Sequence, residues 1–177
     1  MKLLNTTQLW IQRSIDGIDW LSPASDLLIR LWIANIFWKA GMVKIASWEA
    51  TLYLFEYEYQ VPFLPPEIAA YLGTGVELGM PVLLALGLAT RFSAAVLFVF
   101  NIIAVVSYPT LNEIGIKDHQ YWGLLLLLPL FHGAGRLSLD HVIRKIFWRN
   151  DLAATSLGSG SALNLAGRRD QQLMDSK

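Results

Sequence analysis

The chain has 177 residues, of which 54% are hydrophobic and only 16% are charged, and its mean hydropathy is +0.42. A soluble domain usually carries about 25% charged residues, so this composition favours a single membrane domain. The formal net charge of zero gives no basis for nucleic-acid binding, and the lack of cysteine excludes disulfides and thiolate metal sites on this chain.

Residues 1–25 predict an N-terminal cytoplasmic or interfacial arm. They contain no continuous apolar region followed by a small-residue cleavage site, so a signal peptide is not expected. Two interpretations of the arm remain open, a short helix at the membrane interface or a partly ordered tail. Ser22 and Pro23 are typical of a helix start, as N-cap and first helical residue.

Four membrane-spanning helices are predicted within residues 26–135, at about 26–48, 68–88, 92–108 and 120–132. Residues 49–67 are rich in glutamate, tyrosine and proline, and are expected to form a loop or a shallow re-entrant segment. Residues 110–119 are expected to form a second polar loop. The chain is therefore predicted to be all-α, a polytopic four-helix membrane bundle.

One charged residue, Glu77, lies near the middle of the second predicted span. A carboxylate at that depth costs roughly 2.5–3.5 kcal/mol on insertion scales, so it normally faces protein, water or a partner. Glycines in the same segment would let another helix approach closely. These glycines are Gly73, Gly75, Gly79 and Gly87.

Further polar residues are expected near Glu77 inside the bundle. Counting 1.5 Å per residue from the helix ends places Lys39, Glu77 and Asn101 in one layer, with Asn35 somewhat deeper and Lys44 only about 3–6 Å deep. An ion pair beside an amide would hold these groups in hydrocarbon. The pair could be structural and fix helix register, or it could form a polar pocket for a quinone head group or a proton. The Lys44 region is an alternative position for the quinone.

The three histidines, His119, His132 and His141, are expected on different sides of the membrane, with His119 outside. A haem would require two axial ligands on facing helices, so no haem or metal site is predicted. The sequence also contains no nucleotide-binding loop and no serine-nucleophile motif.

Residues 136–150 predict a basic amphipathic helix after the fourth span. Leucine, valine, isoleucine and phenylalanine recur on one face, while Arg144, Lys145 and Arg149 lie elsewhere and would bind an anionic membrane surface. Residues 151–177 are rich in alanine, serine and glycine and predict a disordered tail.

The distribution of lysine and arginine predicts the orientation. Residues 49–67 hold four glutamates and no lysine or arginine, whereas the N-terminal arm, the connection at Arg91 and residues 136–150 carry basic side chains. Because basic residues are enriched on the cytoplasmic side, we expect a multi-pass protein with both termini in the cytoplasm.

Five short motifs, in order and at consistent spacing over about residues 26–141, resemble the DoxX family. They are Arg30-Leu31, Gly41-Met42-Val43-Lys44, Val76-Glu77-Leu78-Gly79, Gly87-Leu88-Ala89-Thr90-Arg91, and Gly133-Ala134-Gly135-Arg136-Leu137-Ser138-Leu139-Asp140. Ala134 departs from the pattern, because many members have proline there.

The resemblance implies a small four-helix protein of the bacterial inner membrane. Relatives are linked to thiosulfate:quinone oxidoreductase, to membrane oxidoreductase complexes, to methylamine-dehydrogenase maturation, or to gene clusters for modified copper-binding peptides, so the family does not fix a reaction. If these positions match, Asp140 paired with Arg91 or Arg136 would clamp the exit of the fourth span, and Arg30 is a further ion-pair candidate.

The first hypothesis is a membrane subunit of a quinone-linked oxidoreductase system. Without cysteine or a haem pair, electrons would come through a soluble or membrane partner subunit, or by direct contact between substrate and quinone. The alternative is a non-enzymatic factor that recruits soluble partners for metalloprotein or modified-peptide maturation. A small-molecule or ion pathway is a third hypothesis, which would require a homo-oligomer.

Overall fold

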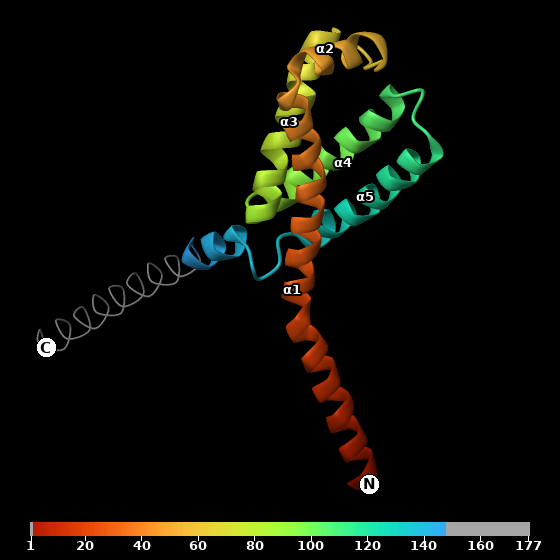
Figure 1. Cartoon of the computed structure of the whole chain (residues 1–177). Helices are drawn as coiled ribbons and strands as arrows, with labels where there is room; N and C mark the ends of the chain where they lie inside the picture. The colour runs from red at the N-terminus through yellow and green to blue at the C-terminus, as the bar shows by residue number, and fades with distance from the viewer. Residues whose placement is uncertain (1, 148–177) are drawn as a thin grey trace, which may run out of the picture. The chain divides into compact units, whose positions relative to one another are not determined.

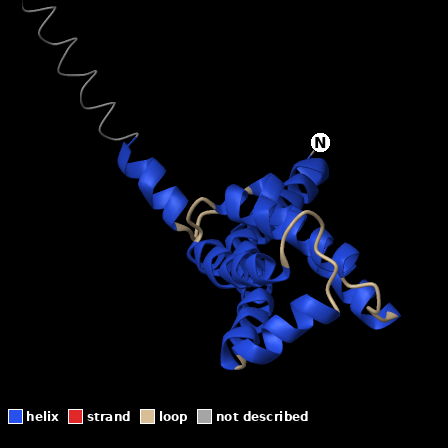
Figure 2. Cartoon of the chain, turned by 90° about the horizontal axis from the view of Figure 1, so that it is seen from above, coloured by secondary structure: helices blue, strands red, loops and turns tan. Residues whose placement is uncertain are grey.

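The computed structural model describes residues 2–147, with side chains described from residue 21 onward. Its helices are α1 (Lys2–Ala46), α2 (Trp48–Tyr57), α3 (Pro66–Leu86), α4 (Thr90–Ser107) and α5 (Glu113–His132), followed by a helix over residues 139–147 (Figure 1). Residues 2–147 contain no strand (Figure 2), so the predicted all-α fold class is confirmed.

The chain divides into two units, residues 1–140 and 141–177. In the second unit, residues 141–147 are helical, and Arg144 and Lys145 are exposed beside exposed apolar side chains. Arg149 and the tail predicted at 151–177 lie outside the described residues.

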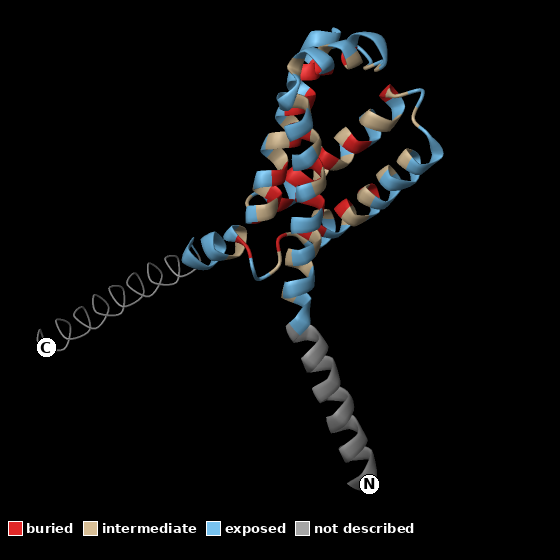
Figure 3. Ribbon diagram, in the orientation of Figure 1, coloured by how far each residue is buried: buried red, intermediate tan, exposed pale blue. Residues whose placement is uncertain are grey.

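The first unit exposes large apolar side chains along its helices, while its buried residues face inward (Figure 3). Val106 of α4 is 66% exposed and Leu124 of α5 is 64% exposed. The helices α3 and α4 are long and apolar enough to cross a membrane. Such an apolar exterior on helices is typical of contact with lipid.

The core of the first unit joins four helices. Ile33 and Phe37 of α1 pack with Leu84 of α3, Leu97 of α4 and Leu126 of α5, and all five side chains are buried. A smaller buried cluster of Phe55, Ala69 and Ala70 connects α2 to α3. Together these clusters fix α1 and α2 against the hairpin of α3 and α4.

Three predicted boundaries are wrong. The first concerns α1, which does not begin at Pro23 but runs through it as one helix of 45 residues. An internal proline removes one hydrogen-bond donor from the helix ladder, and here the ladder continues on both sides of the gap. The N-terminal arm is therefore helical and continuous with the first predicted span.

The second boundary lies in the loop predicted at 49–67, half of which is the helix α2. Thr51 and Phe55, four residues apart, are its buried residues, and Phe55 packs on α3. Side chains at this spacing share one helical face, so tertiary packing favours the helix.

The third boundary is the start of α5, which begins at Glu113 instead of about residue 120. Asn112 acts as the N-cap, since its side-chain oxygen accepts a hydrogen bond from Gly115 N at 2.8 Å. Glu113 in the first turn also stabilises the positive end of the helix. As a result, His119 lies on a helix and not in a loop.

Candidate functional site

A cavity of about 400 Å³ lies inside the first unit, lined by all five labelled helices and the segment after α2. Most of its wall is apolar, including the aromatic rings of Phe37, Phe55, Phe100 and Trp122. Its polar residues are Lys44, Tyr59, Glu77, Ser107, Tyr108 and His119. An apolar cavity with a few convergent polar groups is typical of a small-molecule site.

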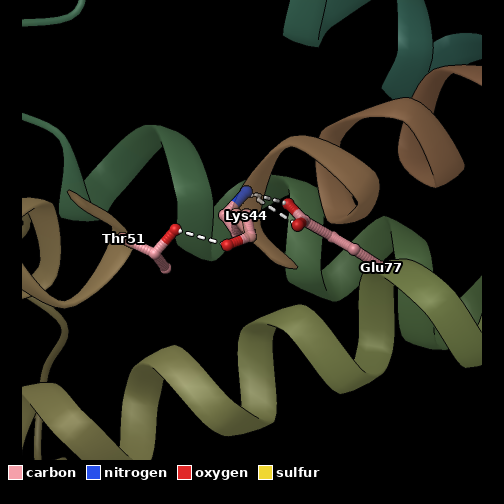
Figure 4. A network of polar contacts seen from close by, with 3 residues as sticks. All are labelled: Lys44, Thr51 and Glu77. Carbon is pink, nitrogen blue, oxygen red and sulfur yellow. Dashed lines mark hydrogen bonds and ion pairs between the residues drawn. The ribbon is translucent and has the colours of Figure 1, made fainter. Parts of the chain in front are cut away.

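An ion pair joins α1 to α3 (Figure 4), and both of its residues line the cavity. Lys44 Nζ donates to Glu77 Oε1 at 2.8 Å and to Oε2 at 2.7 Å, with side-chain exposures of 18% and 7%. The backbone carbonyl of Lys44 accepts a hydrogen bond from Thr51 Oγ1 at 2.9 Å. Thr51 thereby holds the last turn of α1, where carbonyls lack helical partners.

Gly41 explains how Lys44 reaches Glu77. A Cβ atom at Gly41 would lie 2.8 Å from Leu78 Cδ2 and 3.1 Å from Glu77 Cβ, so only glycine allows α3 to approach this closely. Lys44 follows Gly41 by three residues and therefore lies on the same face of α1. The glycine and the lysine together make the contact between the helices.

The expected pairing of Lys39 with Glu77 is wrong, since Glu77 pairs with Lys44. Lys39 and Asn35 are exposed, and neither lines the cavity. Depth counting compared Cα positions, whereas the long stem of a lysine carries its ammonium group well away from its own Cα. Asn101 is buried as expected, but its partner is His119.

Asn101 of α4 and His119 of α5 form a second polar pair. Asn101 Nδ2 donates to the backbone oxygen of His119 at 2.9 Å, and Asn101 Oδ1 lies 2.7 Å from His119 Nδ1. The imidazole also packs against Trp122, with ring centroids 4.7 Å apart. These contacts fix the ring from two sides at the cavity wall.

His119 also lines a second hollow, a groove of about 510 Å³ between α4 and α5. The groove wall is largely aliphatic, with Ile102, Val105 and Leu124 among its residues. Among the described residues, His119 is the one that lines both the groove and the cavity.

The segment after α2 covers one end of the cavity. Gln60 N donates to Ser107 O at 2.7 Å, and Tyr108 Oη donates to Glu58 Oε2 at 3.2 Å. Burial raises the pKa of Tyr59, and nearby negative charge adds to the shift, so its phenol stays protonated. Among the described residues, no group is placed to hydrogen-bond the buried Ser107 Oγ, which lines the cavity.

Sequence reasoning missed the role of His119 because it assigned this residue to a loop. The signal was present, since Asn112, Glu113 and Gly115 mark a helix start. With α5 beginning there, His119 precedes the buried Gly123 and Leu126 by four and seven residues, the spacing of one helical face.

The other end of the bundle contains a buried arginine, far along α1 from Lys44. Arg30 is 1% exposed, and its guanidinium donates to the backbone oxygens of Leu84, Ala85 and Leu137. Gly87, at φ +68°, makes room for it, because a Cβ there would clash with Arg30 Nη1. The positive charge thus stabilises the carbonyl end of α3.

Asp140 binds the turn between α3 and α4. Its carboxylate accepts from Ala89 N at 2.8 Å and from Thr90 N at 3.0 Å, and its own amide donates to Gly87 O at 2.9 Å. We expected Asp140 to clamp this turn through an ion pair with an arginine. The hydrogen bonds that hold the turn are instead made with its backbone amides. They give α4 the N-cap that its own residues do not supply.

The predicted arginine partners lie at the surface of the same end. Arg91 is exposed and donates from Nη2 to Phe131 O at 3.2 Å, at the last turn of α5. Arg136 is also exposed. Among the described residues, no cluster of histidine, aspartate and glutamate side chains is arranged to hold a metal ion.

Apolar helices that surround a buried ion pair and a cavity define a helical membrane protein. The model of the DoxX family matches residues 25–109. An uncharacterized protein of Haemophilus influenzae is 31% identical over 135 residues, which cover 71% of this chain and 87% of that protein. No solved structure matches. The chain belongs to the DoxX family, as the five sequence motifs suggested.

Proposed function

We propose that this DoxX-family protein is a membrane subunit of a quinone-linked oxidoreductase system and that the cavity holds the quinone head group. The observation that carries the proposal is an aromatic-walled cavity of about 400 Å³ with the Lys44–Glu77 ion pair in its wall. Ligand sites typically enclose about 300–1,000 Å³ and place a few polar groups among apolar walls.

The residues in the wall are compatible with a quinone ring. Flat aromatic side chains can pack against its faces, and a carbonyl oxygen requires a hydrogen-bond donor at its edge. An ammonium group has three donors, and the carboxylate of Glu77 uses two donors of Lys44, which leaves one for the ligand. A bound quinone would supply two-electron redox chemistry, and the sequence has no cysteine that could replace it.

The proposed setting is the bacterial inner membrane, with α3, α4, α5 and the second half of α1 crossing it and both termini in the cytoplasm. The excess of lysine and arginine at the α3–α4 turn and after α5 supports this orientation. The electron donor would then be a partner subunit, because the sequence contains no cysteine that could pass electrons to the quinone.

The test is to purify the protein in mild detergent and to extract any bound quinone for chromatography with mass detection. We expect a stoichiometric quinone from the wild type and none from the variant that combines Lys44→Met with Glu77→Gln, which keeps the site neutral. Lys39→Met, at an exposed position on the same helix, is the control and should retain the quinone. A wild type that neither retains a quinone nor gains thermal stability from a decyl-substituted para-benzoquinone would refute the proposal.

The second candidate function is a non-enzymatic membrane factor that recruits soluble partners for metalloprotein or modified-peptide maturation. Its support is the exposed basic pair Arg144 and Lys145, which lies in the second unit. Reversing both charges to glutamate should abolish recruitment under this hypothesis and leave quinone retention unchanged under the first.

A further inference from the structure

The contacts of Asn101 determine which nitrogen of His119 carries a proton. Because Asn101 Nδ2 donates to the backbone oxygen of His119, the amide cannot be reversed without bringing two oxygens together. Asn101 Oδ1, which can only accept, therefore faces His119 Nδ1, and Nδ1 must be the donor. In the neutral ring the lone pair is then on Nε2, the nitrogen that Asn101 does not contact.

The cavity thus offers a ligand two different polar groups. Lys44 provides an N–H donor from α1, and the neutral His119 provides an acceptor from α5. A quinol hydroxyl can donate to an imidazole nitrogen, whereas a quinone carbonyl oxygen cannot, because two lone pairs would face each other. At the lysine, a hydroxyl and a carbonyl oxygen can both accept.

This inference rests on the quinone-binding function proposed above. We infer that His119, held by Asn101, makes the site selective for the reduced, hydroxyl-bearing form of the head group. Lys44 holds one oxygen of the ring in either form, and His119 distinguishes the two forms at the other oxygen. The aliphatic groove between α4 and α5, which His119 also lines, is where a lipid tail would leave the cavity.

Protonation of His119 removes this preference, because Nε2 then becomes a donor, and both a quinone carbonyl oxygen and a quinol hydroxyl oxygen can accept from it. Other ionisable groups around the cavity could contribute to a pH dependence. They are Lys44 of α1, Glu77 of α3, Tyr59 and Glu58 after α2, Tyr108 after α4 and Asp118 beside His119.

The experiment measures the affinity of the purified protein, under anaerobic conditions, for a decyl-substituted para-benzoquinone and for the corresponding quinol. We expect the wild type to bind the quinol about tenfold more tightly at about pH 8, the effect of one hydrogen bond, and this ratio of affinities to fall towards unity as the pH is lowered. The amide of His119→Gln offers both a donor and an acceptor. This variant should therefore bind the quinone and the quinol with similar affinities, and the ratio of these affinities should not depend on pH.

His132→Gln is the matched control, since His132 is exposed on the same helix and lines neither the cavity nor the groove. It should behave as the wild type. Equal affinities of the wild type for both forms at all pH values, or a preference retained in His119→Gln, would overturn the inference alone. If neither form binds to the wild type, the proposed function fails with it.

Discussion

The bundle buries charge at two ends, and it does so in different ways. At the α3–α4 turn, Arg30 binds three backbone carbonyls and Asp140 binds two backbone amides. At the other end, Lys44 and Glu77 bind each other in the wall of a cavity. The first arrangement uses charge to complete the ends of helices, whereas the second leaves polar side chains accessible to a ligand. The comparison favours a structural role for the arginine end, and it agrees with the ligand site that we propose at the lysine end.

The largest expected effect is at the arginine end. Arg30→Ala should lower the free energy of unfolding by about 3–5 kcal/mol, because it removes a buried guanidinium and leaves one buried and two part-buried carbonyls without this donor. Thermal or denaturant unfolding in detergent measures this change. A loss below about 1 kcal/mol would show that the buried arginine does not hold this end together.

At the lysine end, stability and binding should separate. Glu77→Gln alone should cost about 2 kcal/mol, between the value for an average polar contact in a membrane protein and that for a broken buried ion pair. Adding Lys44→Met should restore part of this stability, since no unpaired charge remains, but quinone retention should stay lost. Recovery of quinone retention in the double variant would place the ligand elsewhere.

Glycines give a smaller and better controlled effect. Gly87→Ala should cost about 1–3 kcal/mol, because φ is +68° and the new Cβ would meet Arg30 and Ser138. Gly75→Ala is the matched control, since a Cβ there has no neighbour within 4 Å and alanine favours a helix. Equal unfolding temperatures for the two variants would contradict the role assigned to the α3–α4 turn.

The smallest effect is expected at Lys39. Because this side chain is exposed and does not line the cavity, Lys39→Met should change neither quinone retention nor the free energy of unfolding by more than about 0.5 kcal/mol. A loss of the quinone in this variant would restore Lys39 to the site and weaken the contrast between the two ends.

The sequence predicted most of the fold because its signals are local. Runs of apolar residues marked α3 and α4, and the isolated Glu77 marked a buried position. The failures have local causes as well. Pro23 predicted a helix start although an isolated proline can lie within a helix, and the capping residue Asn112 was assigned to a loop.

The candidate site was only partly predictable, because its contacts depend on how helices pack. The partner of Glu77 is decided by the close approach at Gly41, which no depth count along a single helix contains. Tyr59, Ser107 and Tyr108 come together because the segment after α2 bonds to the end of α4. Such contacts link residues about 50 positions apart and leave no periodic signal.

The hydrogen bonds of Asp140 also affect the order in which the protein can be completed during synthesis. The amides at the start of α4 receive their cap from a residue 50 positions later, so α3 and α4 emerge from the ribosome long before their turn is finished. The match to the family model stops at residue 109, but the first unit is complete only at residue 140. A truncated chain that ends after α5 would therefore keep its helices and lack the contact that closes the hairpin.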